Sequence, residues 1–175
     1  THKFYIFVFS SYIMRKGVVL LGLAFLVSIF LILTIQLAIV SAASYRGEYF
    51  QSKSFNNDKK FIGTPKLVRT DADIFFDWWM GSPHTSIKAD KFAVRWTKSE
   101  VYVAGRYQFQ VIVNDGVNLS VDNNPIINQW SDRTAAATFT TQIDLAAGTH
   151  AIRMEYYENT GSATAILIIN LTKLY

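Results

Sequence analysis

The clearest pattern in this sequence is Gly105-Arg-Tyr-Gln-Phe-Gln-Val-Ile-Val113, in which aromatic or apolar residues alternate with polar ones. An alternation with a period of two predicts a half-buried strand, because successive side chains of a strand point to opposite faces. Ala151-Ile-Arg-Met-Glu-Tyr156 follows the same rule and places Ile152, Met154 and Tyr156 on one face. The two segments predict sheets that pack one face on a core.

Segments on either side of this stretch are also rich in β-branched and aromatic residues, and turn-forming residues separate them. Five of them are predicted to be strands: Ile74–Trp79, Phe92–Thr97, Val117–Asp122, Thr138–Leu145 and Ala163–Leu171. The sequence after residue 44 contains no convincing amphipathic helix. Many short strands without helices predict an all-β fold, an antiparallel sandwich or a barrel-like variant of one.

A hydrophobic helix is predicted to precede the β-domain. No charged residue occurs from Gly17 to Ser44, and this length suffices to span a bilayer, which needs about 20 apolar residues. Met14-Arg15-Lys16 provides a basic start, and Ala42-Ala43 provides the small residues of a cleavage site. The segment 14–43 is therefore either a cleaved signal peptide or a retained signal-anchor. Both place residues 44–175 outside the cytoplasm, secreted or at the cell surface.

Residues 1–13 precede this leader and are interpreted as an upstream extension or the edge of a fragment. Three of the 17 basic residues lie before the β-domain. The domain itself therefore contains 14 basic and 13 acidic residues, a net charge of +1. Nucleic-acid binding calls for a basic patch or stripe, which the sequence lacks. Contact with a membrane is expected only through the hydrophobic helix, if it is not cleaved.

The sequence contains no pattern typical of an enzyme. Catalytic fingerprints such as G-x-S-x-G, H-E-x-x-H and the P-loop are absent, and there is no cysteine to serve as a nucleophile. Asp71/Asp73 and Glu155/Glu158 are close in sequence, as glycosidase carboxylates would be in space, but we expect such neighbouring acids to be solvated. The sequence therefore predicts binding rather than catalysis.

Eight blocks of the β-domain resemble a known family when they are taken in order. They are Tyr45–Phe50, Gly81-Ser82-Pro83, Asp90–Thr97, Ala104–Phe109, Asn114–Asp122, Ile127–Asp132, Leu145–His150 and Ile152–Glu158. In this order and spacing they are similar to the PA-fourteen domain, a β-sandwich named after a fragment of a toxin's protective antigen. The resemblance implies an extracellular carbohydrate-binding or adhesion module, possessing no enzymatic activity of its own.

The resemblance also implies a calcium site. Sugar-binding members hold Ca²⁺ with two consecutive aspartates joined by a cis peptide and with an asparagine from a later loop, and the ion binds sugar hydroxyls. Asn114 and Asp115 match the aspartate pair, and Glu158, next to Asn159, matches the loop asparagine. The charge lost at Asn114 would return at Glu158. Hard Ca²⁺ accepts both carboxylate and amide oxygens.

Alternatives remain at each position. Asn114-Asp115-Gly116 is also typical of a tight hairpin turn. Trp130 would either stack on a sugar or pack in the core. The sequence departs from many bacterial members at Ser120, where they have tryptophan. The residues at Asn114 and Ser120 favour the alternative of a structural or protein-interaction module without a sugar site. A third alternative is an accessory module of a larger surface enzyme.

Overall fold

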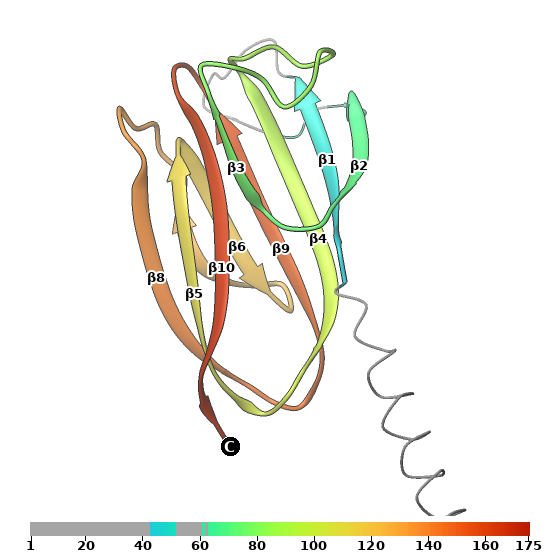
Figure 1. The fold of residues 1–175 in the computed structure, drawn as a ribbon, viewed down its shortest axis with the longest axis vertical. Coiled ribbons are helices and arrows are strands. Elements are labelled where there is room, and N and C mark those ends of the chain that lie inside the picture. Colours follow the sequence, from blue (N-terminus) through green and yellow to red (C-terminus); the bar gives the residue numbers. More distant parts are fainter. Residues whose placement is uncertain (1–42, 52–60, 62) are drawn as a thin grey trace, which may run out of the picture. The chain divides into compact units, whose positions relative to one another are not determined.

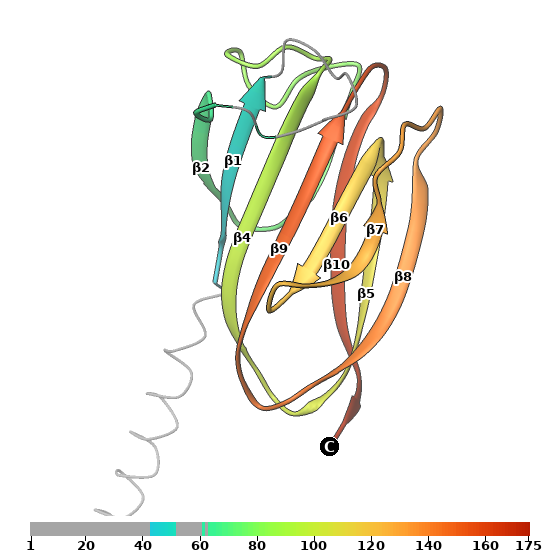
Figure 2. The same cartoon turned by 180° about the vertical axis from the view of Figure 1, so that it is seen from behind.

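The computed structural model describes residues 43–51, 61 and 63–175, which form ten strands in two sheets (Figures 1 and 2). The strands are β1 (Tyr45–Gln51), β2 (Leu67–Asp71), β3 (Phe75–Trp79), β4 (Phe92–Tyr102), β5 (Gly105–Asn114), β6 (Gly116–Val121), β7 (Asn124–Gln129), β8 (Ala137–Leu145), β9 (Gly148–Glu158) and β10 (Ala163–Leu174). One sheet has the order β2-β1-β4-β9-β6-β7 and the other has the order β3-β10-β5-β8. The predicted antiparallel β-sandwich is confirmed.

The predicted hydrophobic helix lies outside the described residues, as do the predicted segment 1–13 and nearly all of 14–43. Among the residues that the structure does describe, no helix is long and apolar enough to cross a membrane. The chain divides into two compact units, and the second of them, Ala43–Tyr175, contains the whole sandwich.

The seven predicted strands are all present, but three strands were not predicted. β2 and β7 are edge strands of the six-stranded sheet, and β1 lies next to β2. Asp122 and Asn123 have positive φ angles of 49° and 65° and form the two-residue turn between β6 and β7, as expected for a primed hairpin turn. Pro125 then lies in the edge strand β7, where a missing N–H group is tolerated.

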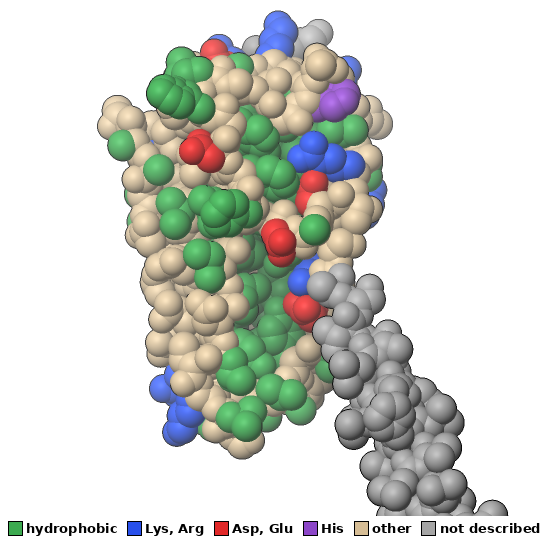
Figure 3. Space-filling model, viewed as in Figure 1, with side chains coloured by type: hydrophobic (Ala, Val, Ile, Leu, Met, Phe, Trp, Pro, Cys, Tyr) green, Lys and Arg blue, Asp and Glu red, His purple; other side chains and the backbone are tan. Residues whose placement is uncertain are grey.

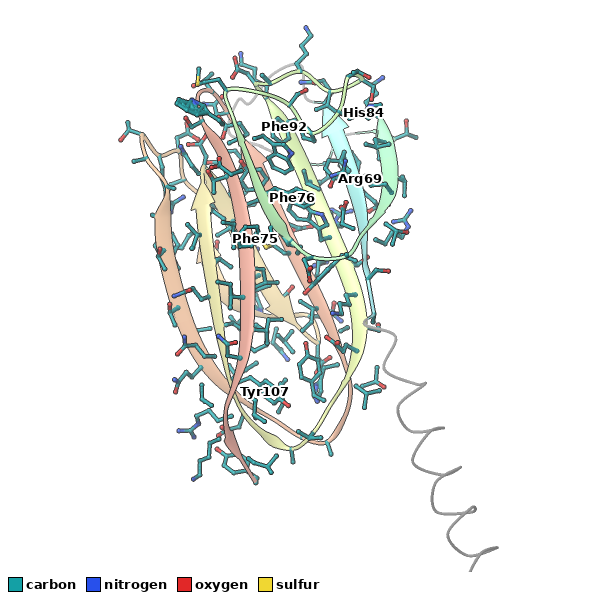
Figure 4. All side chains as sticks on the ribbon, viewed as in Figure 1. Arg69, Phe75, Phe76, His84, Phe92 and Tyr107 are labelled. Atoms are coloured by element: carbon teal, nitrogen blue, oxygen red, sulfur yellow. The ribbon has the colours of Figure 1, made fainter. Side chains whose placement is uncertain are left out.

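Aromatic side chains fill the space between the two sheets. The rings of Phe76 and Trp78 stack at 4.8 Å, and Phe76 also stacks on Trp96 at 5.7 Å. Tyr156 packs against Trp96 at 6.3 Å and against Phe92 at 6.0 Å. Figure 4 shows Phe76 and Phe92 between the sheets. Offset and edge-on ring pairs of this kind add to the free energy gained from burial alone.

A buried carboxylate connects the first two strands to this core. Asp71 is only 7% exposed and accepts hydrogen bonds from the Tyr49 hydroxyl (2.6 Å), Trp96 Nε1 (2.8 Å) and Arg69 Nε (2.6 Å). Gly47 lies against it, since a Cβ there would come within 2.4 Å of the Asp71 carboxylate. The expectation that Asp71 is a solvated acid is therefore wrong, because the sheet encloses it with three donors.

We predict that Asp71→Ala lowers the free energy of unfolding of the unit Ala43–Tyr175 by about 3 kcal/mol, because it leaves buried donors and a cation without their partner. Asp144→Ala is a matched control, since Asp144 also pairs with an arginine (Arg106 Nε, 2.7 Å) but at the surface. It is expected to cost less than about 1 kcal/mol. Urea denaturation measures both, and equal losses would contradict the structural role of Asp71.

Candidate functional site

Two connections between the sheets meet at one end of the sandwich, the end opposite the C-terminus (Figures 1 and 2). One is the link at Asp115 between β5 and β6, and the other is the loop 159–162 between β9 and β10. Asp115 N donates to Tyr157 O at 3.2 Å, and Asn159 N donates to Asp115 Oδ2 at 2.8 Å. Residues more than forty positions apart in the sequence are thus held together here.

The Asn114–Asp115 peptide bond is cis. β5 belongs to the four-stranded sheet and β6 to the six-stranded sheet, so the chain changes sheet at Asp115. The alternative that Asn114-Asp115-Gly116 is a hairpin turn is therefore wrong, because the flanking strands are not paired with each other. Gly116 is required for packing, since a Cβ there would lie 2.1 Å from the Tyr157 ring.

The Asp115 carboxylate is fixed from two sides. Its Oδ1 accepts a hydrogen bond from Arg133 N at 2.5 Å, and its Oδ2 accepts the one from Asn159 N. The Arg133 side chain also donates to Asp115 O at 2.5 Å. With an exposed fraction of 1%, Asp115 is oriented entirely by protein groups.

Tyr156 lies beneath Asn114 and Glu158. Its hydroxyl donates to Asn114 O at 2.5 Å and lies 3.4 Å from Glu158 Oε2. Burial raises the pKa of Tyr156 well above its ordinary value, so the hydroxyl remains a donor. Asn114 Oδ1 and Glu158 Oε1 are both buried, and neither has a hydrogen-bond partner among the described residues. Two oxygen acceptors beside Asp115 are therefore unsatisfied, which is costly for buried groups.

Glu158 is completely buried, so the expectation of a solvated acid is wrong for it as well. Burial, and then the neighbouring charge of Asp115, raise the pKa of Glu158 to about 8, and Asp90 and Asp132 act in the same direction. Ionised Glu158 is therefore destabilised in the protein without a cation. A positive charge among these carboxylates would reverse this effect.

The structure brings four of the predicted site residues together, namely Asn114, Asp115, Glu158 and Asn159. Asn159 contributes its backbone N–H to Asp115, while its side-chain Nδ2 donates to Asp132 Oδ2 at 3.0 Å. Trp130 does not belong to this group. It is half-buried, packs edge-on against Tyr157 at 4.8 Å, and lines a hollow on the outer face of the six-stranded sheet.

Several residues of this end were not predicted. The sequence predicts only a core position for Tyr156, and it assigns no site role to Asp132 or Arg133, which lie in the irregular stretch between β7 and β8. Successive side chains of a strand point to opposite faces, so Trp78 and Trp79 of β3 cannot both face the core. Trp79 is the outward one, 62% exposed with a φ of 50°.

Trp79 ends β3 opposite Ala163, next to the loop 159–162, and the following Met80 is 63% exposed. Figure 3 shows hydrophobic side chains on the outer face of the four-stranded sheet, near the end of the sandwich opposite the C-terminus. A large exposed aromatic side chain beside polar loops is a common element of ligand sites.

The chemistry of these oxygens fits calcium. No group of three or more histidine, aspartate or glutamate side chains within the described ranges could hold a metal ion on its own. Asp115 and Glu158 supply only two carboxylates, but calcium also accepts amide and backbone oxygens. The unpaired Asn114 Oδ1 is an amide oxygen, and the unpaired Glu158 Oε1 belongs to one of the two carboxylates. They are the atoms that a hard cation would satisfy.

The model of the PA14 domain family matches residues 50–174 of this chain. The chain belongs to the PA14 domain family. The RTX adhesin contains a domain described as sugar-binding whose solved structure superimposes with a TM-score of 0.64 at 17% identity, covering 75% of this chain and 91% of that one. At this identity the likeness shows the fold of the PA14 domain alone.

Two relatives are more similar in sequence to this PA14 domain. The anti-sigma-I factor RsgI3 of Acetivibrio thermocellus is 36% identical over 130 residues, which cover 73% of this chain and 19% of that protein. A solved anti-sigma factor domain-containing protein is also 36% identical, with a TM-score of 0.65 over 74% of this chain and 43% of that one. The chain thus spans less than half the length of these relatives.

We predict that Glu158→Gln stabilises the cation-free domain at pH 8.5 and changes its stability little at pH 5. The ordinary pKa of glutamate is about 4.5, whereas that of Glu158 is raised to about 8, so the folded protein keeps a proton that the unfolded chain releases. The stability due to that proton is present below pH 4.5 and is lost as the pH rises towards 8. Glutamine cannot ionise and avoids this loss.

Thermal unfolding in a chelator at both pH values measures the effect, which is expected to reach several degrees at pH 8.5. Asp73→Asn is the control, since Asp73 is exposed, and it is expected to leave both unfolding temperatures nearly unchanged. An equal gain for Glu158→Gln at both pH values would contradict the prediction.

Proposed function

We propose that this PA14 domain is a non-catalytic carbohydrate-binding module that works outside the cytoplasm and recognises a glycan with the help of calcium. The observation that carries this proposal is the pair of unpartnered buried oxygens, Asn114 Oδ1 and Glu158 Oε1, beside the fixed carboxylate of Asp115. A protein that used this end only for structure would be expected to satisfy these acceptors internally.

Asn114, Asp115 and Glu158 would hold the ion, with backbone oxygens of the loop 159–162 as further candidates. The roles of Arg133 and Asn159 are to orient Asp115 through their N–H groups. When bound, Ca²⁺ supplies open coordination positions that accept neighbouring hydroxyl oxygens of a sugar. Asn114 is neutral where an aspartate would be charged, and Glu158 restores the second negative charge.

Trp79 would provide the apolar part of the recognition. It is held beside the loop 159–162 by the pairing of β3 with β10, and its indole is largely exposed. Sugar rings present C–H surfaces as well as hydroxyls, so an aromatic face next to a cation matches both. Trp130 would act elsewhere, because it lines the outer face of the six-stranded sheet.

We predict that the unit Ala43–Tyr175, whose core is complete within its own residues, binds Ca²⁺ and that Asp115→Asn weakens this binding by about tenfold or more. Asparagine retains the shape of the side chain and removes its charge. Isothermal titration calorimetry measures the affinity, and Asp144→Asn, at a distant surface site, is the control. An unchanged affinity in Asp115→Asn would contradict the calcium proposal.

A glycan array tests recognition itself. We expect the domain to bind a subset of glycans in Ca²⁺, and to lose them in a chelator and in Asp115→Asn. Trp79→Ala is expected to weaken glycan binding about tenfold while it leaves Ca²⁺ affinity intact, because Trp79 pairs with Ala163 at the end of the loop 159–162 and supplies no oxygen ligand. No glycan bound under either condition would contradict the proposal and favour a structural or protein-interaction module.

The 36% identity to RsgI3 favours a second function, that of the ligand-sensing part of an anti-sigma factor. In that case glycan binding at the same site would be a signal and not an attachment. Removing the coding region for residues 44–175 in the host distinguishes the two. A sensor deletion is expected to alter transcription controlled by a sigma factor, whereas an adhesin deletion reduces attachment and leaves transcription unchanged.

A further inference from the structure

A hollow of about 460 Å³ lies on the outer face of the six-stranded sheet, away from the calcium-type site. It is lined by Phe61, Arg95, Asn118, Asn128, Trp130 and Glu155. Four of these residues come from four strands, β4, β9, β6 and β7, which run side by side (Figure 2). The floor of the hollow is therefore sheet, whereas Phe61 and Trp130 come from connections between strands.

Register places the polar residues of this hollow in one straight row. Arg95 is paired with Glu155, Glu155 with Asn118, and Asn118 with Asn128. Neighbouring strands are about 4.8 Å apart, so the row crosses roughly 14 Å of the sheet. A row of this length and direction suits an extended ligand that lies across the strands.

The charges of the row are neutralised within it. Arg95 Nε is 2.8 Å from Glu155 Oε1, and Arg95 Nη1 is 3.8 Å from Glu48 Oε2. Glu48 is paired in turn with Arg46. Among the described residues that line the hollow, the charged side chains are Arg95 and Glu155, so their charges cancel while hydrogen-bond donors and acceptors remain. The complementary ligand is an uncharged molecule with many hydrogen-bonding groups.

One acceptor of the row is unused. Asn118 Oδ1 is buried and has no hydrogen-bond partner within the part of the chain that the structure describes, whereas the neighbouring Asn128 is exposed. A hydroxyl donor entering the hollow would satisfy Asn118 Oδ1 without breaking any bond of the protein. Asn114 Oδ1 lacks a hydrogen-bond donor in the same way, but it lies beside two carboxylates. The described residues that line the hollow include one carboxylate, that of Glu155, which is already paired with Arg95.

Aromatic rings bound the hollow. Trp130 packs edge-on on Tyr157, which fixes it, and the Phe61 ring lies 4.3 Å from the Arg95 guanidinium. Hydroxyl-binding amides flanked by aromatic surface match the alternating polar and C–H surfaces of a sugar chain. We infer that this hollow is a second, metal-independent binding site for a neutral linear polysaccharide.

Native affinity electrophoresis of the unit Ala43–Tyr175 in EDTA tests the inference, with xyloglucan, galactomannan and mixed-linkage β-glucan as neutral probes and polygalacturonate and alginate as charged ones. We expect at least one neutral probe to retard the protein in EDTA. The double variant Asn118→Ala/Asn128→Ala and the single variant Trp130→Ala are each expected to weaken that retardation about tenfold or more. Gln142→Ala on β8 of the other sheet is the matched control and is expected to behave as the parent.

The two sites are separable in this experiment. Asp115→Asn is expected to retain full binding in EDTA, and its loss of Ca²⁺-dependent binding would concern the first site alone. The inference is overturned if no neutral probe is retarded in EDTA, if only charged probes are, or if the double variant binds as the parent does. Since the double variant removes only side chains without internal hydrogen bonds, circular dichroism is expected to show an unchanged fold.

Discussion

The hydrogen bond from the Tyr156 hydroxyl to the Asn114 carbonyl is the contact through which the core positions the end that carries the candidate site. The Tyr156 ring is completely buried between Trp96 and Phe92, so its position follows from the packing of the two sheets. The Tyr156 hydroxyl fixes the position of the Asn114 carbonyl, and Asp115 is the next residue along the chain. Because interiors are close-packed, such a chain of contacts fixes loop atoms as firmly as core atoms.

The topology explains why the functional groups gather at one end. β5 and β6 lie in different sheets, as do β9 and β10, so both connections cross between the sheets, and they do so at the same end of the sandwich (Figure 1). A crossing connection cannot be a simple hairpin, and its backbone groups need partners from other loops. Asp115 provides such partners by accepting N–H groups from Arg133 and Asn159. The carboxylate that completes the fold of the loops is thus also the one best placed for a ligand.

Sequence patterns predicted the strands that bury one face. They failed where contacts between distant parts of the chain decide whether a segment is a strand or whether a side chain is buried. Period-two alternation found β5 and β9 because the inward residues of Tyr107–Val113 and of Ile152–Tyr156 are apolar. It missed β7, where Pro125 indicated a turn but an edge strand tolerates proline. The resemblance located Asn114, Asp115 and Glu158. It could not reveal that Glu158 is buried, that Asp71 is enclosed by three donors, or that Trp79 and not Trp78 faces solvent, since these depend on which sheet each neighbour joins.

Tyr157 stands between the loop end and the outer-face hollow. Its hydroxyl donates to Asp132, which also accepts from Asn159, while its ring supports Trp130. The rigid strand β9 therefore positions both places at once: Glu155 faces the hollow, Tyr157 lies between, and Glu158 faces the loops. Two sites of modest affinity on one rigid strand would bind a long polymer together. Once one site has bound, the effective concentration of the polymer at the second site, and not the affinity of that site alone, governs the second contact. If both proposed sites bind, the sandwich would reach an avidity for a long polymer that neither surface would provide separately.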